Sequence, residues 1–336
     1  MAARLGRPIH KLMRLALVPA LVAVPNAGAG QPWVARAGIA ESRQLRMGGA
    51  TIEVDFARGA MDLSRDAVMR HIRAAAAAVT NYYGQFPVKK ARILVVPEAG
   101  RRGGFGGTTW GDMDGYQGFT RLRIGEHATE AGLRKDWVAT HEMVHMAFPT
   151  MPENQHWIEE GQATYIEPIA RVKTGELTAE EVWGEMVRGM PQGEPQAGDE
   201  GLDRTHTWAR TYWGGALFCL VADVEIHKAT ENKMGLRDAL RAVVAAGGTI
   251  DQEWPLEKAL KIGDKATGTH VLMRLYRAWR EKPVEVNLPK LWAELGVQMD
   301  ADGKVTFDAK APLAKVREAI AGKVTAPKRL RFVAAK

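Results

Sequence analysis

The chain has 336 residues, of which 46 % are hydrophobic and 25 % are charged. This composition is typical of globular proteins and excludes a collagen-like chain, a coiled coil and a wholly disordered chain. A single cysteine, Cys219, excludes an internal disulfide and any zinc site built from several cysteines. Nine histidines are present, so a metal site would have to use imidazoles and carboxylates.

The basic excess of the chain is concentrated at its N-terminus. Residues 1–29 contain four basic residues and no acidic one, an apolar run over 15–24, and the small residues Ala27-Gly28-Ala29 at the end. This order is typical of a secretory signal peptide and predicts a secreted or periplasmic protein. The apolar run is too short to span a bilayer, so no stable membrane span is expected after the signal is removed. Without these residues the net charge falls from +7 to +3, which argues against a nucleic-acid-binding protein.

Residues 30–126 are predicted to form a strand-rich lobe. Alternating or continuous apolar runs predict its strands, and a serine followed by an alanine-rich stretch predicts a capped helix. The predicted elements are strands at 51–56, 91–96 and 119–124 and a helix from Ser64 to about Tyr83. The glycines between 103 and 111 are predicted to form either a mobile loop or a backbone segment that binds an extended peptide, with Gly106 and Gly107 as the candidate contacts.

Residues 127–250 are predicted to form a helical lobe, and residues 251–336 a helical C-terminal extension. Apolar residues recur there with helical spacing. The predicted helices lie near 130–148, 157–171, 178–190, 207–229 and 234–246. The Gly-, Pro- and acid-rich stretch 190–203 is predicted to be exposed and mobile. A hairpin turn is expected at 300–303 before a strand at 305–307.

The motif that predicts chemistry is H-E-x-x-H at residues 141–145. On a helix, His141 and His145 project from one side about 6 Å apart, so both imidazoles can bind one zinc ion. Glu142 is rotated by about 100° from His141, towards the open position of the metal, where it can act as a general base. The alternative is two surface histidines and a solvated glutamate, because the motif occurs by chance in on the order of one in a hundred such chains.

A catalytic zinc site needs a third protein ligand, and the predicted helix that follows can supply it. Glu159 and Glu160 differ by about 100° on a helix, so only one of them can face the metal. Glu167 lies two turns after Glu160 on the same face, which favours Glu160 as the ligand and makes Glu167 a candidate to orient a ligand imidazole. Thr164, one turn after Glu160, could assist. His156, one turn before it, is either a substrate contact or an ordinary loop histidine.

The sequence H-E-M-V-H followed by W-I-E-E-G-Q-A-T-Y-I-E resembles the gluzincin zinc metallopeptidases, in particular the aminopeptidase N and glycyl aminopeptidase group. The resemblance implies an α+β, thermolysin-like, two-lobed fold with one Zn²⁺ in the cleft. It also implies the zinc ligands His141, His145 and Glu160 and the general base Glu142. Residues 212–215, Y-W-G-G, resemble the family's tyrosine motif, which implies that Tyr212 stabilises the oxyanion.

Three departures from the family pattern leave the mode of cleavage open. Fourteen residues separate His145 from Glu160, fewer than in aminopeptidase N, and Gly214 stands where the family has a lysine. No segment matches the G-x-M-E-N motif that anchors a substrate's amino group, which leaves Glu159 as the candidate anchor. We therefore expect a zinc metallopeptidase acting on peptides or proteins, either as an aminopeptidase or as an endopeptidase. The alternative from another class is a non-catalytic, zinc-bearing peptide-binding protein of the cell envelope.

Overall fold

The computed structural model of the protein describes residues 38–322, apart from the side chain of Phe105. The predicted signal peptide lies outside the described residues. Within 38–322, no helix combines the length and the apolar character needed to cross a membrane.

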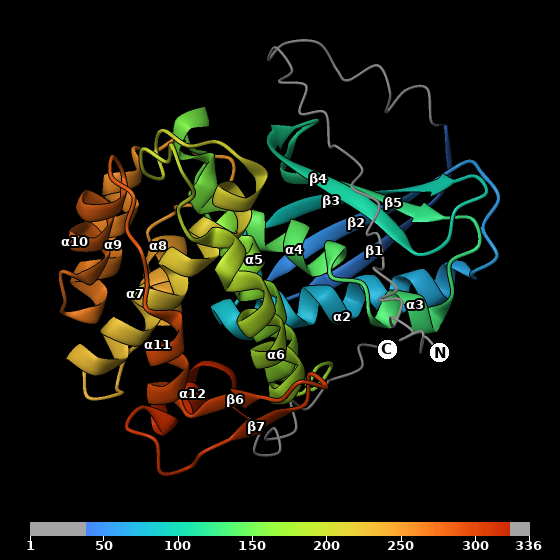
Figure 1. The fold of residues 1–336 in the computed structure, drawn as a ribbon. Coiled ribbons are helices and arrows are strands. Elements are labelled where there is room, and N and C mark those ends of the chain that lie inside the picture. The colour runs from blue at the N-terminus through green and yellow to red at the C-terminus, as the bar shows by residue number, and fades with distance from the viewer. Residues whose placement is uncertain (1–37, 323–336) are drawn as a thin grey trace, which may run out of the picture. The chain divides into compact units, whose positions relative to one another are not determined.

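The N-terminal part contains a five-stranded mixed sheet (Figure 1). Its strands are β1 (Ile39–Met47), β2 (Ala50–Ala57), β3 (Lys90–Glu98), β4 (Gly104–Met113) and β5 (Tyr116–Gly125). They lie in the order β1-β2-β3-β5-β4, in which β2, β3 and β5 are parallel and the outer pairs are antiparallel. The three predicted strands are therefore confirmed, with bounds extended by up to three residues.

The glycine-rich segment is a strand rather than the mobile loop that was one of the two expectations. It forms β4, at one edge of the sheet, and pairs with β5 along most of its length. The two strands are joined by a tight turn in which Asp114 has φ 54° and Gly115 has φ 75°. An Asp-Gly pair with positive φ at both residues is the preferred two-residue hairpin connection.

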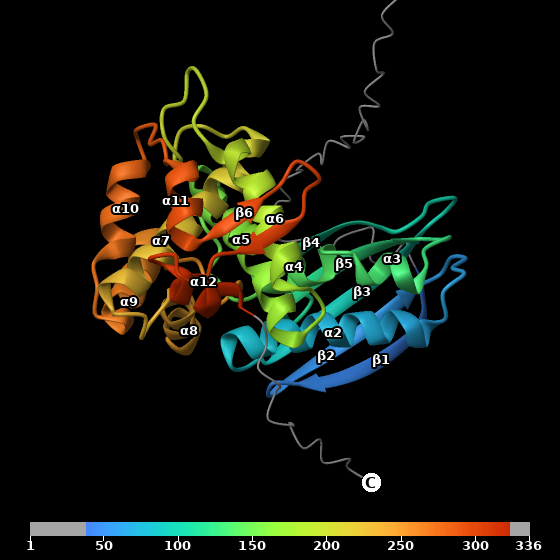
Figure 2. The ribbon, with the colours of Figure 1, turned by 60° about the horizontal axis from the view of Figure 1, so that its bottom comes forward.

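A long helix, α2 (Arg65–Tyr83), connects β2 to β3 and lies along one face of the sheet (Figure 2). The Ser64 hydroxyl accepts a hydrogen bond from the Ala67 backbone N–H, which starts the helix as predicted. Gly84 ends it in the left-handed conformation with φ 82°. The buried side of α2 consists mainly of alanine and valine, and these small side chains let it lie close to the strands.

Helices dominate after residue 129; most of them lie to the left of the sheet in Figure 1, whereas α3 lies beside α2. They are α3 (Glu130–Arg134), α4 (Val138–His145), α5 (His156–Thr174), α6 (Ala179–Gly189), α7 (Gly215–Ala229), α8 (Leu236–Ala245), α9 (Leu256–Thr267), α10 (Val271–Trp279), α11 (Leu288–Leu295) and α12 (Ala314–Ala321). Short helical turns lie at Glu153–Gln155 and Met190–Gly193, and a π-helical turn lies at Arg210–Gly214. A hairpin of β6 (Val297–Met299) and β7 (Val305–Phe307) confirms the turn predicted between residues 300 and 303.

One expectation for this part is wrong, and another holds only in part. The single helix expected over 130–148 is split into α3 and α4, because the Asp136 carboxylate accepts a hydrogen bond from the Val138 N–H at 3.0 Å and starts a new helix. The stretch 190–203 is exposed at 191–192, 196–198 and 200, as predicted, but its C-terminal end is anchored. Leu202 is fully buried, and the Asp203 carboxylate accepts hydrogen bonds from the Trp157 indole and the Tyr276 hydroxyl, both at 2.8 Å.

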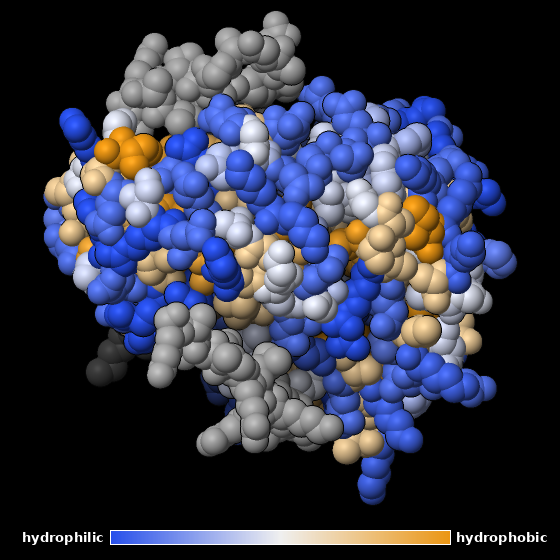
Figure 3. Space-filling model, turned by 180° about the vertical axis from the view of Figure 1, so that it is seen from behind, coloured by the Kyte–Doolittle hydropathy of each residue, from blue (hydrophilic) through white to orange (hydrophobic). Residues whose placement is uncertain are grey.

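One continuous hydrophobic core connects the sheet, α2, α4, α5, α7 and the helices beyond them. The surface seen from behind is mostly hydrophilic, with small separate hydrophobic patches (Figure 3). The tightest helix contact within this core is the crossing of α5 and α7. A Cβ atom at Gly161 would lie 2.2 Å from the Gly215 Cα, and one at Gly215 would lie 2.1 Å from the Trp157 carbonyl oxygen. Neither position accepts a side chain.

We expect Gly161→Ala to lower the free energy of unfolding by about 1–3 kcal/mol, because the added methyl group must push the two helix backbones apart. The control is Gly184→Ala on α6, where a Cβ would meet only side-chain atoms at 3.1 Å or more. Alanine's better helix propensity, worth up to about 1 kcal/mol, should make the control neutral or stabilising. Urea unfolding of the three proteins measures the difference; equal stability of Gly161→Ala and wild type would contradict the crossing described.

Candidate metal centre and catalytic site

Helix α4 carries the H-E-x-x-H motif into the interior. His141 is 3 % exposed and Glu142 is 7 % exposed, so these side chains do not lie on a solvated helix face. The Val144 side chain, on the same short helix, is also fully buried. The alternative of two surface histidines with a solvated glutamate is therefore inconsistent with this burial.

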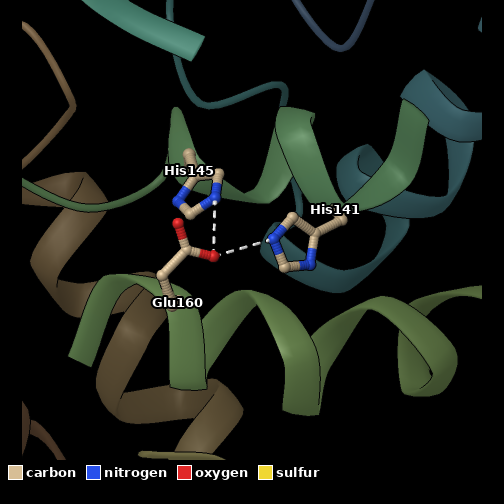
Figure 4. A group of neighbouring side chains, drawn as sticks. All are labelled: His141, His145 and Glu160. Atoms are coloured by element: carbon tan, nitrogen blue, oxygen red, sulfur yellow. Dashed lines mark hydrogen bonds and ion pairs between the residues drawn. The ribbon is translucent and has the colours of Figure 1, made fainter. Parts of the chain in front are cut away.

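Helix α5 returns beside α4 and brings Glu160 to the two histidines. Glu160 Oε2 lies 3.1 Å from His141 Nε2 and 3.7 Å from His145 Nε2. Figure 4 shows that both imidazoles point from α4 towards the Glu160 carboxylate, which extends from the facing helix. One ligand atom from each residue can be chosen so that all three lie within 4.8 Å of one another.

The electrostatics of this cluster favour a neutral His145 imidazole and an ionised Glu160 carboxylate. Burial lowers the pKa of His145 to about 4, so its imidazole is neutral at pH 7. Burial alone would raise the pKa of Glu160, but His145 and hydrogen bonds from His141 and His156 hold it well below its usual value. The hydrogen bond and charge of Glu160 outweigh burial at His141 and raise the pKa of that imidazole.

The donor chemistry of the cluster fits a zinc ion. Two imidazole nitrogens and one carboxylate oxygen form one of the ligand sets of catalytic zinc sites, which leave a fourth position for water or substrate. Zinc prefers such borderline nitrogen and oxygen donors, whereas calcium and magnesium take oxygen ligands almost alone. His141, His145 and Glu160 are thus the residues that could hold a metal.

Glu142, the residue beside His141, is held under the edge strand β4. The Thr109 hydroxyl donates a hydrogen bond to Glu142 Oε2 at 2.8 Å, and the Thr120 hydroxyl lies 2.9 Å from the Thr109 hydroxyl. A Cβ at Gly107 would lie 2.3 Å from the Glu142 Cγ, so only glycine leaves room for this side chain. Burial raises the pKa of Glu142 to about 7.

Tyr212 reaches the cluster from the π-helical turn that precedes α7. Burial raises the pKa of its phenol, and the nearby Glu160 carboxylate raises it further. Its ring stacks on the His141 imidazole, with centroids 6.2 Å apart and an interplanar angle of 11°. Single π-helical turns within α-helices are frequent at functional sites, because the extra residue redirects a side chain.

The two candidate substrate contacts on α5 pair with each other. His156 Nδ1 lies 3.0 Å from Glu159 Oε2, and His156 Nε2 lies 3.1 Å from Glu160 Oε1. These hydrogen bonds raise the pKa of His156 to about 10. The Glu159 carboxylate therefore faces His156 and the backbone N–H of Met151, while the neighbouring Glu160 carboxylate faces the histidines.

Glu167 does not make the hydrogen bond to an imidazole that the sequence led us to expect. Its Oε1 accepts a hydrogen bond from Arg171 Nη1 at 2.7 Å, and His141 Nδ1 has no hydrogen-bond partner among the described residues. The Glu167 charge still acts on His141, whose pKa it raises. Thr164 is half-buried one turn after Glu160, and its hydroxyl makes no described hydrogen bond to the three candidate ligands. The candidate backbone contact Gly106 lies on β4, with φ 132°.

Three residues that the sequence analysis missed contribute to the site: Thr109, Trp137 and Trp208. Alternation along a strand places Thr109 on the same face as Gly107, so the strand period could have indicated it once β4 was recognised. The two tryptophans pack against His141 and Tyr212 respectively, with ring centroids 4.9 and 5.3 Å apart. Helical spacing contains the signal for both, since each lies four residues before its partner.

Comparison with known proteins supports the fold. No protein-family model and no curated protein matches the sequence. Among solved structures, an aminopeptidase N family protein from Idiomarina loihiensis is 13 % identical, with a TM-score of 0.56 over 77 % of this chain and 50 % of its own. An M1 zinc metallopeptidase from Deinococcus radiodurans is 15 % identical, with a TM-score of 0.46 over 74 % of this chain and 53 % of its own.

The chain spans about half the length of these structures. The likeness to the Idiomarina protein shows that the described part shares the mixed α+β fold of that structure. The predicted α+β class, with strands in the N-terminal part and helices in the C-terminal part, is thereby confirmed.

We expect protein stripped by a chelator to rebind about one zinc ion per chain, because three buried donors converge on one point. His141→Ala should weaken zinc binding by at least about 100-fold, since it removes one of the three donors that a zinc site of this kind needs. The control is His206→Ala, which removes an exposed imidazole outside the cluster. Calorimetry and elemental analysis measure both; His141→Ala that binds zinc as tightly as wild type would disprove the metal centre.

Proposed function

We propose that this chain is a zinc-dependent peptidase, in which His141, His145 and Glu160 hold the metal and Glu142 is the general base. The observation that carries the proposal is the buried convergence of two imidazoles and one carboxylate, with a second carboxylate adjacent to them. A binding site alone would not require Glu142, whose carboxylate accepts no hydrogen bond from the three candidate ligands and is held instead by Thr109.

The proposed reaction is hydrolysis of a peptide bond by one water molecule. A bound zinc ion would supply Lewis-acid polarisation of the scissile carbonyl and of that water. Glu142 accepts a proton from the water as its oxygen attacks the carbonyl carbon. Glu142 then gives the proton to the amide nitrogen, so the carbon–nitrogen bond breaks and a free amine and a carboxylic acid result.

Tyr212 is proposed to stabilise the negative charge that develops on the carbonyl oxygen. Its phenol lies in the electrostatic range of Glu160 and Glu142, and its ring stacks on His141, so its hydroxyl belongs to the same site. Such a donor acts at the moment when the charge appears. The outer edge of β4 pairs with no other described strand, so we propose that its backbone at Gly106 and Gly107 binds an extended peptide; Gly107 lies directly over Glu142.

Export to the periplasm or the medium belongs to the same proposal and rests on residues 1–29 of the sequence. The alternative function is a non-catalytic, zinc-bearing peptide-binding protein of the cell envelope. Digestion of a peptide library, analysed by mass spectrometry with and without chelator, separates the two. Chelator-sensitive cleavage supports the peptidase, and peptide binding without cleavage supports the alternative.

We expect Glu142→Gln to retain zinc and lose hydrolysis by several orders of magnitude, because the donor set stays intact while the base is removed. Tyr212→Phe should lower kcat by about 100-fold or more, the usual cost of one oxyanion donor. Steady-state kinetics with parallel zinc analysis measure both. A Tyr212→Phe enzyme with wild-type kcat would remove Tyr212 from the mechanism.

Thr109→Val should lower kcat by about 10- to 100-fold with zinc content unchanged, because it removes a charge-assisted hydrogen bond that positions Glu142. Thr109→Ser keeps the hydroxyl and should restore most of the rate. The matched control is Thr108→Val, since the Thr108 hydroxyl bonds only to the adjacent Gly107 carbonyl on the same strand. Equal rates for Thr109→Val and Thr108→Val would show that Thr109 does not position the base.

The mode of cleavage is tested by comparing a peptide with its N-acetylated copy. If the enzyme is an aminopeptidase, only the free peptide is cut, and Glu159→Gln should raise KM or abolish turnover, because a charged amine loses its anchor. If it is an endopeptidase, both peptides are cut at equal rates. A neutral effect of Glu159→Gln on an enzyme that cuts only free peptides would exclude Glu159 as the anchor.

A further inference from the structure

Two tryptophans beside the candidate site are unusually exposed. Within residues 38–322, four large hydrophobic side chains are exposed, and two of them are Trp137, at 49 %, and Trp208, at 55 %. Both contact residues of the candidate site, and the other two, Ile39 and Met234, are only 37 % exposed. Single exposed hydrophobic residues are ordinary on a surface, but two tryptophans packed against one buried site are not explained in that way.

The tryptophans extend a continuous aromatic run through the site. Trp208 stacks on Tyr212 with centroids 5.3 Å apart and an interplanar angle of 23°, and Tyr212 stacks in turn on His141. Trp137 meets the same imidazole edge-on at an interplanar angle of 80°. One face of the Trp208 indole is therefore covered by Tyr212, and more than half of the side chain is left to solvent.

Resting on the proposed function, we propose that Trp208 binds a bulky apolar or aromatic side chain of the peptide substrate. The Tyr212 hydroxyl is assigned to the scissile carbonyl, so a ring stacked on Tyr212 lies nearest to the residue that provides this carbonyl. That residue precedes the scissile bond. The open indole face gives its side chain an apolar surface on which phenylalanine or leucine is desolvated, whereas alanine is too short to cover it.

The position of Trp208 also explains how binding couples to the reaction. Trp208 lies two residues before the π-helical turn Arg210–Gly214, which carries Tyr212 to the cluster. A side chain held against the indole lies over the same turn, so the carbonyl next to it is brought towards the Tyr212 hydroxyl. The residue that binds the substrate side chain and the residue that stabilises the oxyanion therefore lie on adjacent turns of one chain segment.

The experiment uses two peptides that differ only in the residue before the cleaved bond, phenylalanine or alanine. Cleavage is measured as kcat and KM in wild type, Trp208→Ala and Trp208→Phe. Binding of both peptides is measured by calorimetry in the zinc-loaded Glu142→Gln background. The control is Trp254→Ala. Trp254 lies outside the aromatic run, and Lys258 Nζ lies 3.5 Å from the centroid of its ring.

We expect wild type to prefer the phenylalanine peptide, and Trp208→Ala to reduce that preference by about tenfold through KM and through the binding constant. Trp208→Phe should keep most of the preference, and Trp254→Ala all of it. An equal fall in kcat for both peptides would mean that Trp208 only supports Tyr212 and would overturn the inference. The inference would also be overturned if Trp208→Ala slowed cleavage of a disaccharide-linked cell-wall peptide more than cleavage of the phenylalanine peptide. That result would mean that the indole binds a sugar.

The possible results distinguish a failure of the role proposed for Trp208 from a failure of the proposed peptidase function. Peptide cleavage that is unchanged by Trp208→Ala removes the inference alone. If wild type cleaves neither peptide and the Glu142→Gln protein binds neither, the proposed peptidase function fails, and the inference fails with it.

Discussion

The contact between Gly161 on α5 and Gly215 at the start of α7 is the constraint on which the site depends. The two backbones approach so closely that a single added Cβ would overlap the facing chain. Gly161 directly follows Glu160, and Gly215 lies three residues after Tyr212. The crossing therefore fixes how the helix that carries Glu160 lies against the turn that carries Tyr212. Small residues at a helix crossing permit this approach because no side chain separates the helices.

The sheet supplies the second wall of the site. Helix α4 lies between the sheet and α5, so its histidines face Glu160 while Glu142 faces β4. Three acidic side chains, Glu142, Glu160 and Glu167, are buried near one another, which is unfavourable unless cations compensate them. Arg171 compensates Glu167, and a metal ion would compensate Glu160. Metal binding to the folded chain should accordingly add to the stability of the fold.

The sequence allowed the short-range parts of this site to be predicted. The projection of His141 and His145 from one side of a helix follows from helical spacing alone. The choice of Glu160 over Glu159 also used Glu167 as a partner for an imidazole, and Glu167 pairs with Arg171 instead. The prediction of Tyr212 required a resemblance to known peptidases, because 51 residues separate it from Glu160 and nothing local indicates that they lie close together.

Thr109 was missed for a similar reason: its partner Glu142 is 33 residues away, on another type of element. The split between α3 and α4 and the anchored end of the stretch 190–203 depend on single carboxylates, Asp136 and Asp203, whose partners the sequence does not reveal.

The most direct test of this account is X-ray absorption spectroscopy at the zinc edge of the metal-loaded protein. The account predicts four nitrogen or oxygen neighbours at about 2.0–2.1 Å and the outer scattering pattern of two imidazoles. In His145→Ala the pattern should fall to that of one imidazole. A spectrum with one imidazole or none in the wild-type protein, or with a six-oxygen shell, would contradict the assignment of His141, His145 and Glu160 as the metal ligands.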